Sequence, residues 1–73
     1  DQLMRDEQTK LVHNALGLLT DEHREILVLR EMDGCDYEQI AELLSINVGT
    51  VRSRLHRARS QLKERLQELD ESP

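Results

Sequence analysis

The sequence is nearly without aromatic side chains: its 73 residues include one tyrosine, no phenylalanine and no tryptophan. A hydrophobic core must therefore be built from leucine, isoleucine, valine and alanine. β-Branched residues are few and scattered, which disfavours strands, whereas leucine, glutamate, arginine and glutamine are abundant and favour helices. The composition predicts an all-α fold, and the length allows a single small domain, residues 1–73, with a thin core.

Cysteine pairs and long apolar runs are also missing. Cys35 is the only cysteine, so no internal disulfide can form, and a reducing, cytoplasmic location is the simplest expectation. No stretch approaches the ~20 apolar residues that span a bilayer, and no signal peptide opens the chain, so membrane insertion is not expected. His13, His23 and His56 share no metal-ligand spacing with Cys35, which predicts no metal site.

The usual sequence features of an enzyme are absent too. The acidic residues are many, but they form no pair that indicates a catalytic pocket. No nucleophile–base pair and no glycine-rich phosphate loop can be recognised. We therefore expect no catalytic residues, no enzymatic activity and no bound cofactor.

Helix signals divide the chain into four segments. Helices are predicted over residues 3–18, 21–32, 37–44 and 48–68. Thr20 or Asp21 can cap the second helix through a side-chain oxygen, and Gly34 suits its left-handed end. Asp36 with Gln39 three residues later resembles a capping box at the start of the third helix. The pattern predicts a four-helix domain.

The last two helices are joined by a very short connection. Ser45-Ile46-Asn47 leaves room only for a tight turn, and Asn47 can then cap the fourth helix. Two helices joined in this way form a helix-turn-helix. The sequence therefore predicts a C-terminal helix-turn-helix whose second member is a long recognition helix.

Charge is distributed unevenly along the chain. The net charge of −5 by itself argues against nucleic acid. Residues 48–65, however, hold six basic residues and one acid, whereas residues 1–47 hold eleven acids and four bases. The Debye length is ~10 Å at about 0.1 M salt, so distant acids are largely screened from a ligand at the basic segment. This asymmetry favours a binding face in the last helix.

The predicted fourth helix is amphipathic when its residues are placed at helical steps. One face carries an aliphatic seam, made of Val51, Leu55, Ala58, Leu62, Leu66 and Leu69. The far side carries Ser53, His56, Arg57 and Ser60, with Arg52 and Arg59 on one flank. The seam predicts a core contact, and the basic side predicts a ligand contact.

Each polar residue of this helix has a predicted role on DNA. Arg52 and Arg57 suit base reading, because a guanidinium can bind guanine O6 and N7 with two hydrogen bonds. Ser53 and His56 can add a base or phosphate contact. Arg54, Arg59 and Lys63 are predicted to neutralise phosphates, which positions the helix without reading sequence. At the helix start, free backbone N–H groups can meet a phosphate, and the residues there are Gly49 and Thr50.

These residues carry a family resemblance. Over about residues 19–66 the chain resembles region 4 of the sigma-70 superfamily and is similar to the extracytoplasmic-function group of bacterial sigma factors. The run most specific to that group is GTVRSRL followed by RAR, at residues 49–55 and 57–59. The resemblance implies a cytoplasmic helical domain that reads the −35 element of double-stranded promoter DNA. It implies docking on the flap-tip helix of the RNA polymerase β subunit and, often, capture by an anti-sigma factor. The residues that it implies face the DNA are Arg52, Ser53, His56 and Arg57.

The chain departs from the family pattern at two positions and in extent. Ser45 stands where glycine is frequent in the turn, and a left-handed residue other than glycine costs ~1 kcal/mol. Asn47 replaces a frequent proline and can cap the helix in its place. Nothing corresponds to region 2, which melts the −10 element. The chain is therefore expected to be an excised C-terminal domain that cannot initiate transcription alone.

Two other functions fit parts of the sequence. Residues 19–27 also resemble the opening helix of the LuxR-type effector domain of response regulators, although the run RSRLHRAR fits the sigma group better. The low net charge and the leucine-rich surfaces also allow a protein-interaction module whose main ligand is an anti-sigma factor.

Overall fold

Four α-helices and one π-helical turn make up the part of the chain that the structure describes. The computed structural model describes the backbone of residues 2–71 and the side chains of residues 7–71. In chain order the elements are α1 (Gln2–Gly17), α2 (Asp21–Leu27), the π-helix η1 (Val28–Met32), α3 (Tyr37–Leu44) and α4 (Val48–Glu71). Residues 2–71 contain no strand, and α3 and α4 form a C-terminal helix-turn-helix, so the predicted fold class is confirmed.

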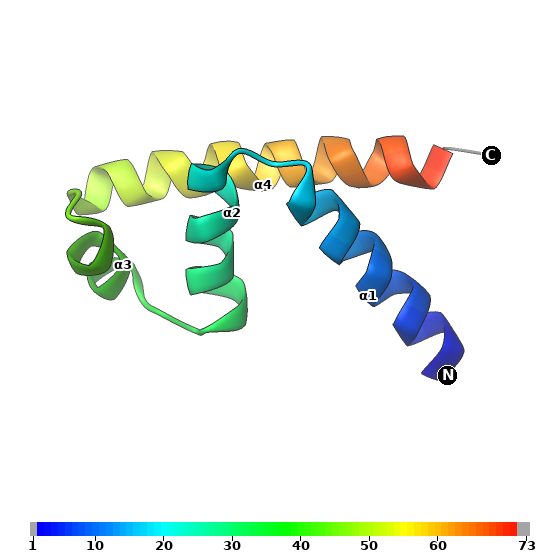
Figure 1. Ribbon diagram of the computed structural model, residues 1–73. Coiled ribbons are helices and arrows are strands. Elements are labelled where there is room, and N and C mark those ends of the chain that lie inside the picture. The colour runs from blue at the N-terminus through cyan, green and yellow to red at the C-terminus, as the bar shows by residue number, and fades with distance from the viewer. Residues whose placement is uncertain (1, 72–73) are drawn as a thin grey trace.

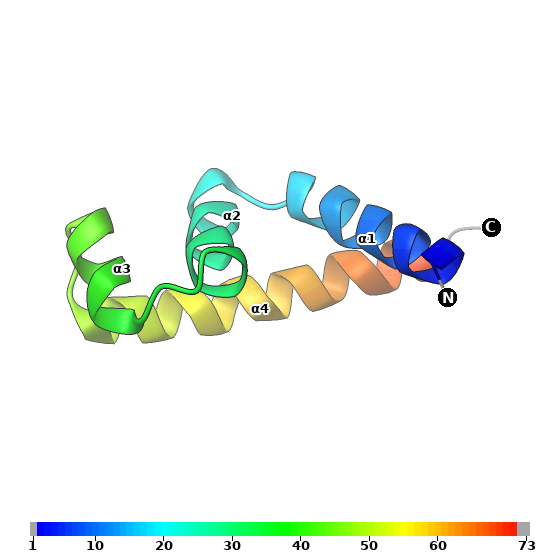
Figure 2. The same ribbon diagram turned by 90° about the horizontal axis from the view of Figure 1, so that it is seen from below.

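The long helix α4 is the support on which the other helices pack. Its 24 residues span ~36 Å at the helical rise, against a longest molecular dimension of 41 Å. The helices α1, α2 and α3 each contact α4, and Figure 1 shows them on one side of it. The turned view in Figure 2 shows α3 at the N-terminal end of α4 and α1 toward its C-terminal half, while Figure 1 shows that α1 runs obliquely away from α4 toward the N-terminus.

An aliphatic core forms where these helices meet. From α4, Val51 and Ala58 are fully buried and Leu55 is 1% exposed. They pack with buried side chains of the other helices, namely Leu16, Leu19, Ile26, Leu27, Ile40 and Ala41. Burying one such leucine or isoleucine side chain stabilises a fold by about 1.5–3 kcal/mol. The first half of the predicted seam is thus the core of the domain, while Leu66 and Leu69 are only half-buried.

The predicted caps are present at the starts of the middle helices. Thr20 Oγ1 accepts a hydrogen bond from the backbone N–H of His23, with an N···O distance of 3.4 Å. Asp36 and Gln39 form a full capping box: each side chain accepts a hydrogen bond from the other residue's backbone N–H at 2.8 Å. These bonds satisfy donors that a helix start otherwise leaves without a partner.

An arginine of α2 fixes the preceding helix. The Arg24 guanidinium donates hydrogen bonds from Nη1 to the carbonyl oxygens of Leu16 and Leu19, at 3.3 and 3.2 Å. Its Nη2 also pairs with Asp21. Carbonyls at the end of a helix lack intrahelical partners, so Arg24 ties the C-terminal end of α1 to the start of α2.

The turn between α3 and α4 is fixed by two residues. Ser45 lies in the left-handed region with φ 56° and ψ 45°, and the Ile46 N–H closes the helix end on the Ala41 carbonyl at 3.0 Å. Asn47 then caps α4, because its Oδ1 accepts a hydrogen bond from the Thr50 N–H at 2.8 Å. The angle of the helix-turn-helix therefore rests on local backbone geometry as well as on the core.

The predicted helix over residues 21–32 is helical over its whole length but changes type after Leu27. It is α-helical only as far as Leu27, and residues 28–32 form the π-helix η1. The Asp33 N–H donates to the Val28 carbonyl five residues earlier, at 3.0 Å, which is the wider π spacing. Gly34, at φ +72°, ends the element in the left-handed conformation as the sequence predicts. The α4 helix runs three residues beyond its predicted end, Glu68.

The cap on α4 makes a direct test of this turn. Replacing Asn47 by alanine should lower the free energy of unfolding by about 1 kcal/mol, because the Thr50 N–H loses its partner. Asn47→Asp keeps an acceptor at the same place and should stay close to the parent. Urea denaturation followed by circular dichroism measures both variants, and an alanine variant as stable as the parent would contradict the role of the cap.

Candidate nucleic-acid interface

The N-terminal half of α4 presents a polar face to solvent. Since Val51, Leu55 and Ala58 are buried, the opposite side of the helix must face outward. The four predicted DNA-facing residues are all exposed: Arg52, Ser53, His56 and Arg57. The structure thus places them together on one open surface, called the reading face below. Their contacts with DNA stay a prediction.

The start of α4 differs from its predicted role. The Thr50 N–H is not free, because it donates to Asn47 Oδ1 at 2.8 Å, and the Thr50 hydroxyl donates to the same oxygen at 3.0 Å. The Thr50 N–H is therefore capped and not free as expected, and a phosphate contact at Thr50 stays a prediction. Gly49 is exposed in the first turn, where helical N–H groups have no intrahelical partner.

The side chains of Ser53, Arg54 and Lys63 differ in how open they are to a ligand. Ser53 Oγ donates a hydrogen bond to the Thr50 carbonyl at 3.2 Å, which leaves its lone pairs open to a donor. Arg54 is half-buried, whereas Lys63 is exposed.

Arg59 is held by an acid of η1. Its Nη2 lies 2.9 Å and its Nε 3.3 Å from Glu31 Oε1, and the two side chains are 47% and 54% exposed. The hydrogen bond to Glu31 is the main reason that the pKa of Arg59 is raised above its ordinary value; burial acts in the opposite direction, and Tyr37 adds a smaller rise. Arg59 is therefore charged at any pH at which the domain can be studied.

A second arginine joins η1 to the start of α3. The Arg30 guanidinium lies 5.2 Å from the centroid of the Tyr37 ring, within the range of a cation–π contact. Its Nη1 also donates to the Cys35 carbonyl at 3.0 Å. The loop from η1 to α3 is thus tied to both of its neighbours. These contacts were not foreseen from the sequence, because no local spacing indicates them.

Charge in the C-terminal half of α4 is balanced within the helix. Arg65 Nη2 lies 3.4 Å from Glu64 and 3.1 Å from Glu68. Beyond it come Asp70 and Glu71, both exposed acids. The positive charge of α4 that is open to a ligand is therefore concentrated toward its N-terminal end.

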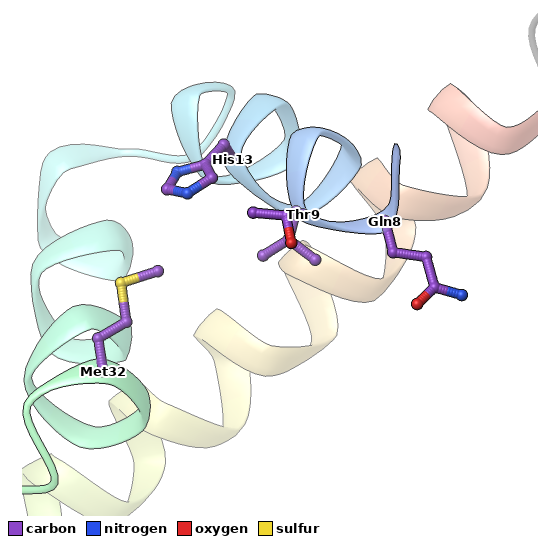
Figure 3. Close-up of a pocket in the computed structure, with 5 residues that line it drawn as sticks. Gln8, Thr9, His13 and Met32 are labelled. Atoms are coloured by element: carbon purple, nitrogen blue, oxygen red, sulfur yellow. The ribbon is translucent and has the colours of Figure 1, made fainter. Parts of the chain in front are cut away.

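A hollow lies between α1 and η1. It has a volume of about 260 Å³ and is lined by Gln8, Thr9, Val12, His13 and Met32. Figure 3 shows Met32 pointing from η1 toward α1, with His13 across from it. Met32 is 52% exposed, which is unusual for so apolar a side chain with neighbours on both sides. The hollow is an apolar surface without an occupant from the described part of the chain.

Other kinds of site find no support in the described residues. No group of three or more histidine, cysteine, aspartate or glutamate side chains among them could hold a metal ion. Cys35 is a free, half-buried thiol. No helix formed by residues 2–71 is both long and apolar enough to cross a membrane.

Comparison with known proteins gives a consistent result. A family model described as "Sigma-70, region 4" matches residues 9–62. The RNA polymerase sigma-H factor of Pseudomonas aeruginosa is 43% identical over 67 residues, 92% of this chain and 35% of that protein. The ECF RNA polymerase sigma-E factors of Haemophilus influenzae and Escherichia coli K12 are 35% and 37% identical, over 94% and 92% of this chain and 36% and 35% of their own lengths. The chain thus spans about a third of the length of these curated relatives, which are named as sigma factors and not as enzymes.

The strength of the Glu31–Arg59 ion pair can be measured by a double-mutant cycle. Because both side chains are about half exposed, we expect a coupling free energy below about 1 kcal/mol. The cycle uses Glu31→Gln, Arg59→Ala and the double variant in urea denaturation. A coupling of several kcal/mol would mean that the pair is a main source of stability, contrary to its exposure.

Proposed function

The chain belongs to the family of sigma-70 region 4 domains, and from this premise we propose that it is the cytoplasmic promoter-reading domain of an extracytoplasmic-function sigma factor. In this proposal α4 enters the major groove of the −35 element of double-stranded promoter DNA. The single observation that carries it is the reading face: Arg52, Ser53, His56 and Arg57 are exposed together while the opposite side of the same helix is the core.

The reading face has the chemistry that major-groove recognition requires. Arg52 and Arg57 are exposed guanidiniums about one and two and a half turns into the helix, where side chains of a recognition helix reach base edges. Ser53 and His56 lie between them on the same surface. Base contacts of this kind distinguish one sequence from another, so these four residues are proposed to set promoter specificity.

Phosphate contacts would position the helix on the duplex. We assign this role to Lys63 and Arg54, and to the open end of α4 at Gly49. Arg59, predicted in the same role from the sequence, instead pairs with Glu31. Each phosphate that a cation neutralises adds about −0.9 to the slope of log K against log salt, so binding should weaken markedly as salt rises.

The hollow between α1 and η1 supports a second contact, with RNA polymerase core. Its lining residues belong to α1 and η1, and α1 packs on α4, whose reading face is turned away from the core, so a duplex and a protein can bind at the same time. Its lining is apolar at Val12 and Met32 and uncharged at Gln8 and Thr9, which suits an apolar protein segment such as the flap-tip helix of the β subunit. An anti-sigma factor would compete for the domain by covering the same surfaces.

Two alternative functions can be distinguished, one by whether the chain copurifies with polymerase core and the other by the effect of replacing Arg52 and Arg57. A LuxR-type effector domain would bind DNA without copurifying with polymerase core, and the family match favours the sigma group. A module whose main ligand is an anti-sigma factor would keep its function when Arg52 and Arg57 are replaced.

Base reading is tested by removing one arginine at a time. Arg52→Ala and Arg57→Ala should each cost about 1–3 kcal/mol of discrimination between a duplex selected by this chain from a random pool and a scrambled duplex. Lys10→Ala removes an equal charge from the exposed surface of α1 and should leave discrimination unchanged. Fluorescence anisotropy at several salt concentrations gives the values. Equal binding of the parent chain to both duplexes would end the proposal.

Docking is tested by placing a charge in the hollow. Met32→Lys should weaken copurification with polymerase core by about tenfold or more, because an unpaired buried ammonium costs several kcal/mol. Leu43→Lys changes a similarly exposed residue of α3, away from the hollow, and is the matched control. If both variants bind core polymerase as the parent does, the hollow is not the docking surface.

A further inference from the structure

The Glu31–Arg59 ion pair lies at one edge of the reading face, on the same flank of α4 as Arg52 seven residues earlier. Arg59 follows Ser53 by six residues, which places it about 120° around the helix from Ser53. That flank of α4 is the one that η1 approaches, since Glu31 belongs to η1 and reaches Arg59 there. Arg59, one of the six basic residues of the segment 48–65, is thus directed toward η1 of the same chain.

The guanidinium of Arg59 is oriented by more than one contact. Its Nε and Nη2 both donate to Glu31 Oε1, at 3.3 and 2.9 Å. The group is planar and rigid, so fixing this edge fixes the direction of the remaining donors. A phosphate that approached Arg59 would also meet the negative charge of Glu31, which repels it.

We propose that Glu31 withholds Arg59 from DNA, so that Arg59 is a positioning residue that holds η1 against α4 and not a phosphate contact. This inference rests on the proposed function only in placing a duplex along α4. Its consequence is that Glu31 lowers the affinity of the domain for any DNA by the contribution of one cation, without touching the residues that read bases.

The experiment measures the salt dependence of binding to a short random-sequence duplex by the chain of residues 1–73. Glu31→Gln keeps the shape of the side chain and removes its charge, which frees Arg59. The slope of log K against log salt should then steepen by about 0.9, the contribution of one phosphate contact. Arg59→Ala alone should leave the slope of the parent unchanged.

Two further variants separate the release of Arg59 from a change of net charge. In the double variant with Glu31→Gln and Arg59→Ala, the slope should return to that of the parent, because the released cation is gone. Glu38→Gln removes another exposed acid, from α3, and should not steepen the slope. Thermal unfolding of each variant verifies that it is folded. A loss of stability by itself does not change the number of phosphates bound by the folded chain.

Three results would overturn the inference. Arg59→Ala could flatten the slope by about 0.9, which would make Arg59 a phosphate contact in the parent. Glu31→Gln could leave the slope unchanged, or Glu38→Gln could steepen it equally. These slopes are measured with a random-sequence duplex and do not depend on promoter specificity. If the parent chain failed to discriminate a selected duplex, the proposed promoter reading would be wrong, but the slopes would still test the role of Glu31.

Discussion

The packing of Val51, Leu55 and Ala58 against the other three helices is the contact on which the rest of the structure depends. These side chains fix the rotation of α4 about its own axis. A rotation by one residue, about 100°, would carry a neighbouring arginine into the core and a leucine into water. The burial of these three aliphatic side chains therefore also determines which residues of α4 are exposed, and so forms the basic surface.

How much could be predicted from the sequence depends on the distance along the chain between interacting residues. The caps at Thr20, Asp36 and Asn47 were predictable, because each acts on a backbone N–H three residues away. The short turn at Ser45 followed from the same local chemistry. The exposure of the reading face followed from helical periodicity, which needs no tertiary information.

Two features of the structure were not predicted, because local patterns in the sequence do not indicate them. The Glu31–Arg59 pair joins residues 28 apart, and neither residue has a local feature that indicates the other. No local pattern in the sequence indicates the π-helical turn that carries Glu31, so an ordinary α-helical repeat was expected there. At Thr50 the sequence predicted both a cap and a free N–H group, which cannot hold together, and the cap is what forms. Whether the whole chain is one domain stays a prediction.

The distribution of charge along α4 has a mechanical consequence. Arg52, Arg54, Arg57 and Lys63 lie in its first two thirds, whereas Arg65 is neutralised by Glu64 and Glu68, and Asp70 and Glu71 follow. The helix is thus an electric dipole, and the peptide dipoles add to it in the same sense. In the field of a polyanion such a rod experiences a torque that turns its N-terminal end inward and lifts its C-terminal end away. In the proposed complex with promoter DNA, this torque would set the direction in which α4 enters the groove before any base is contacted.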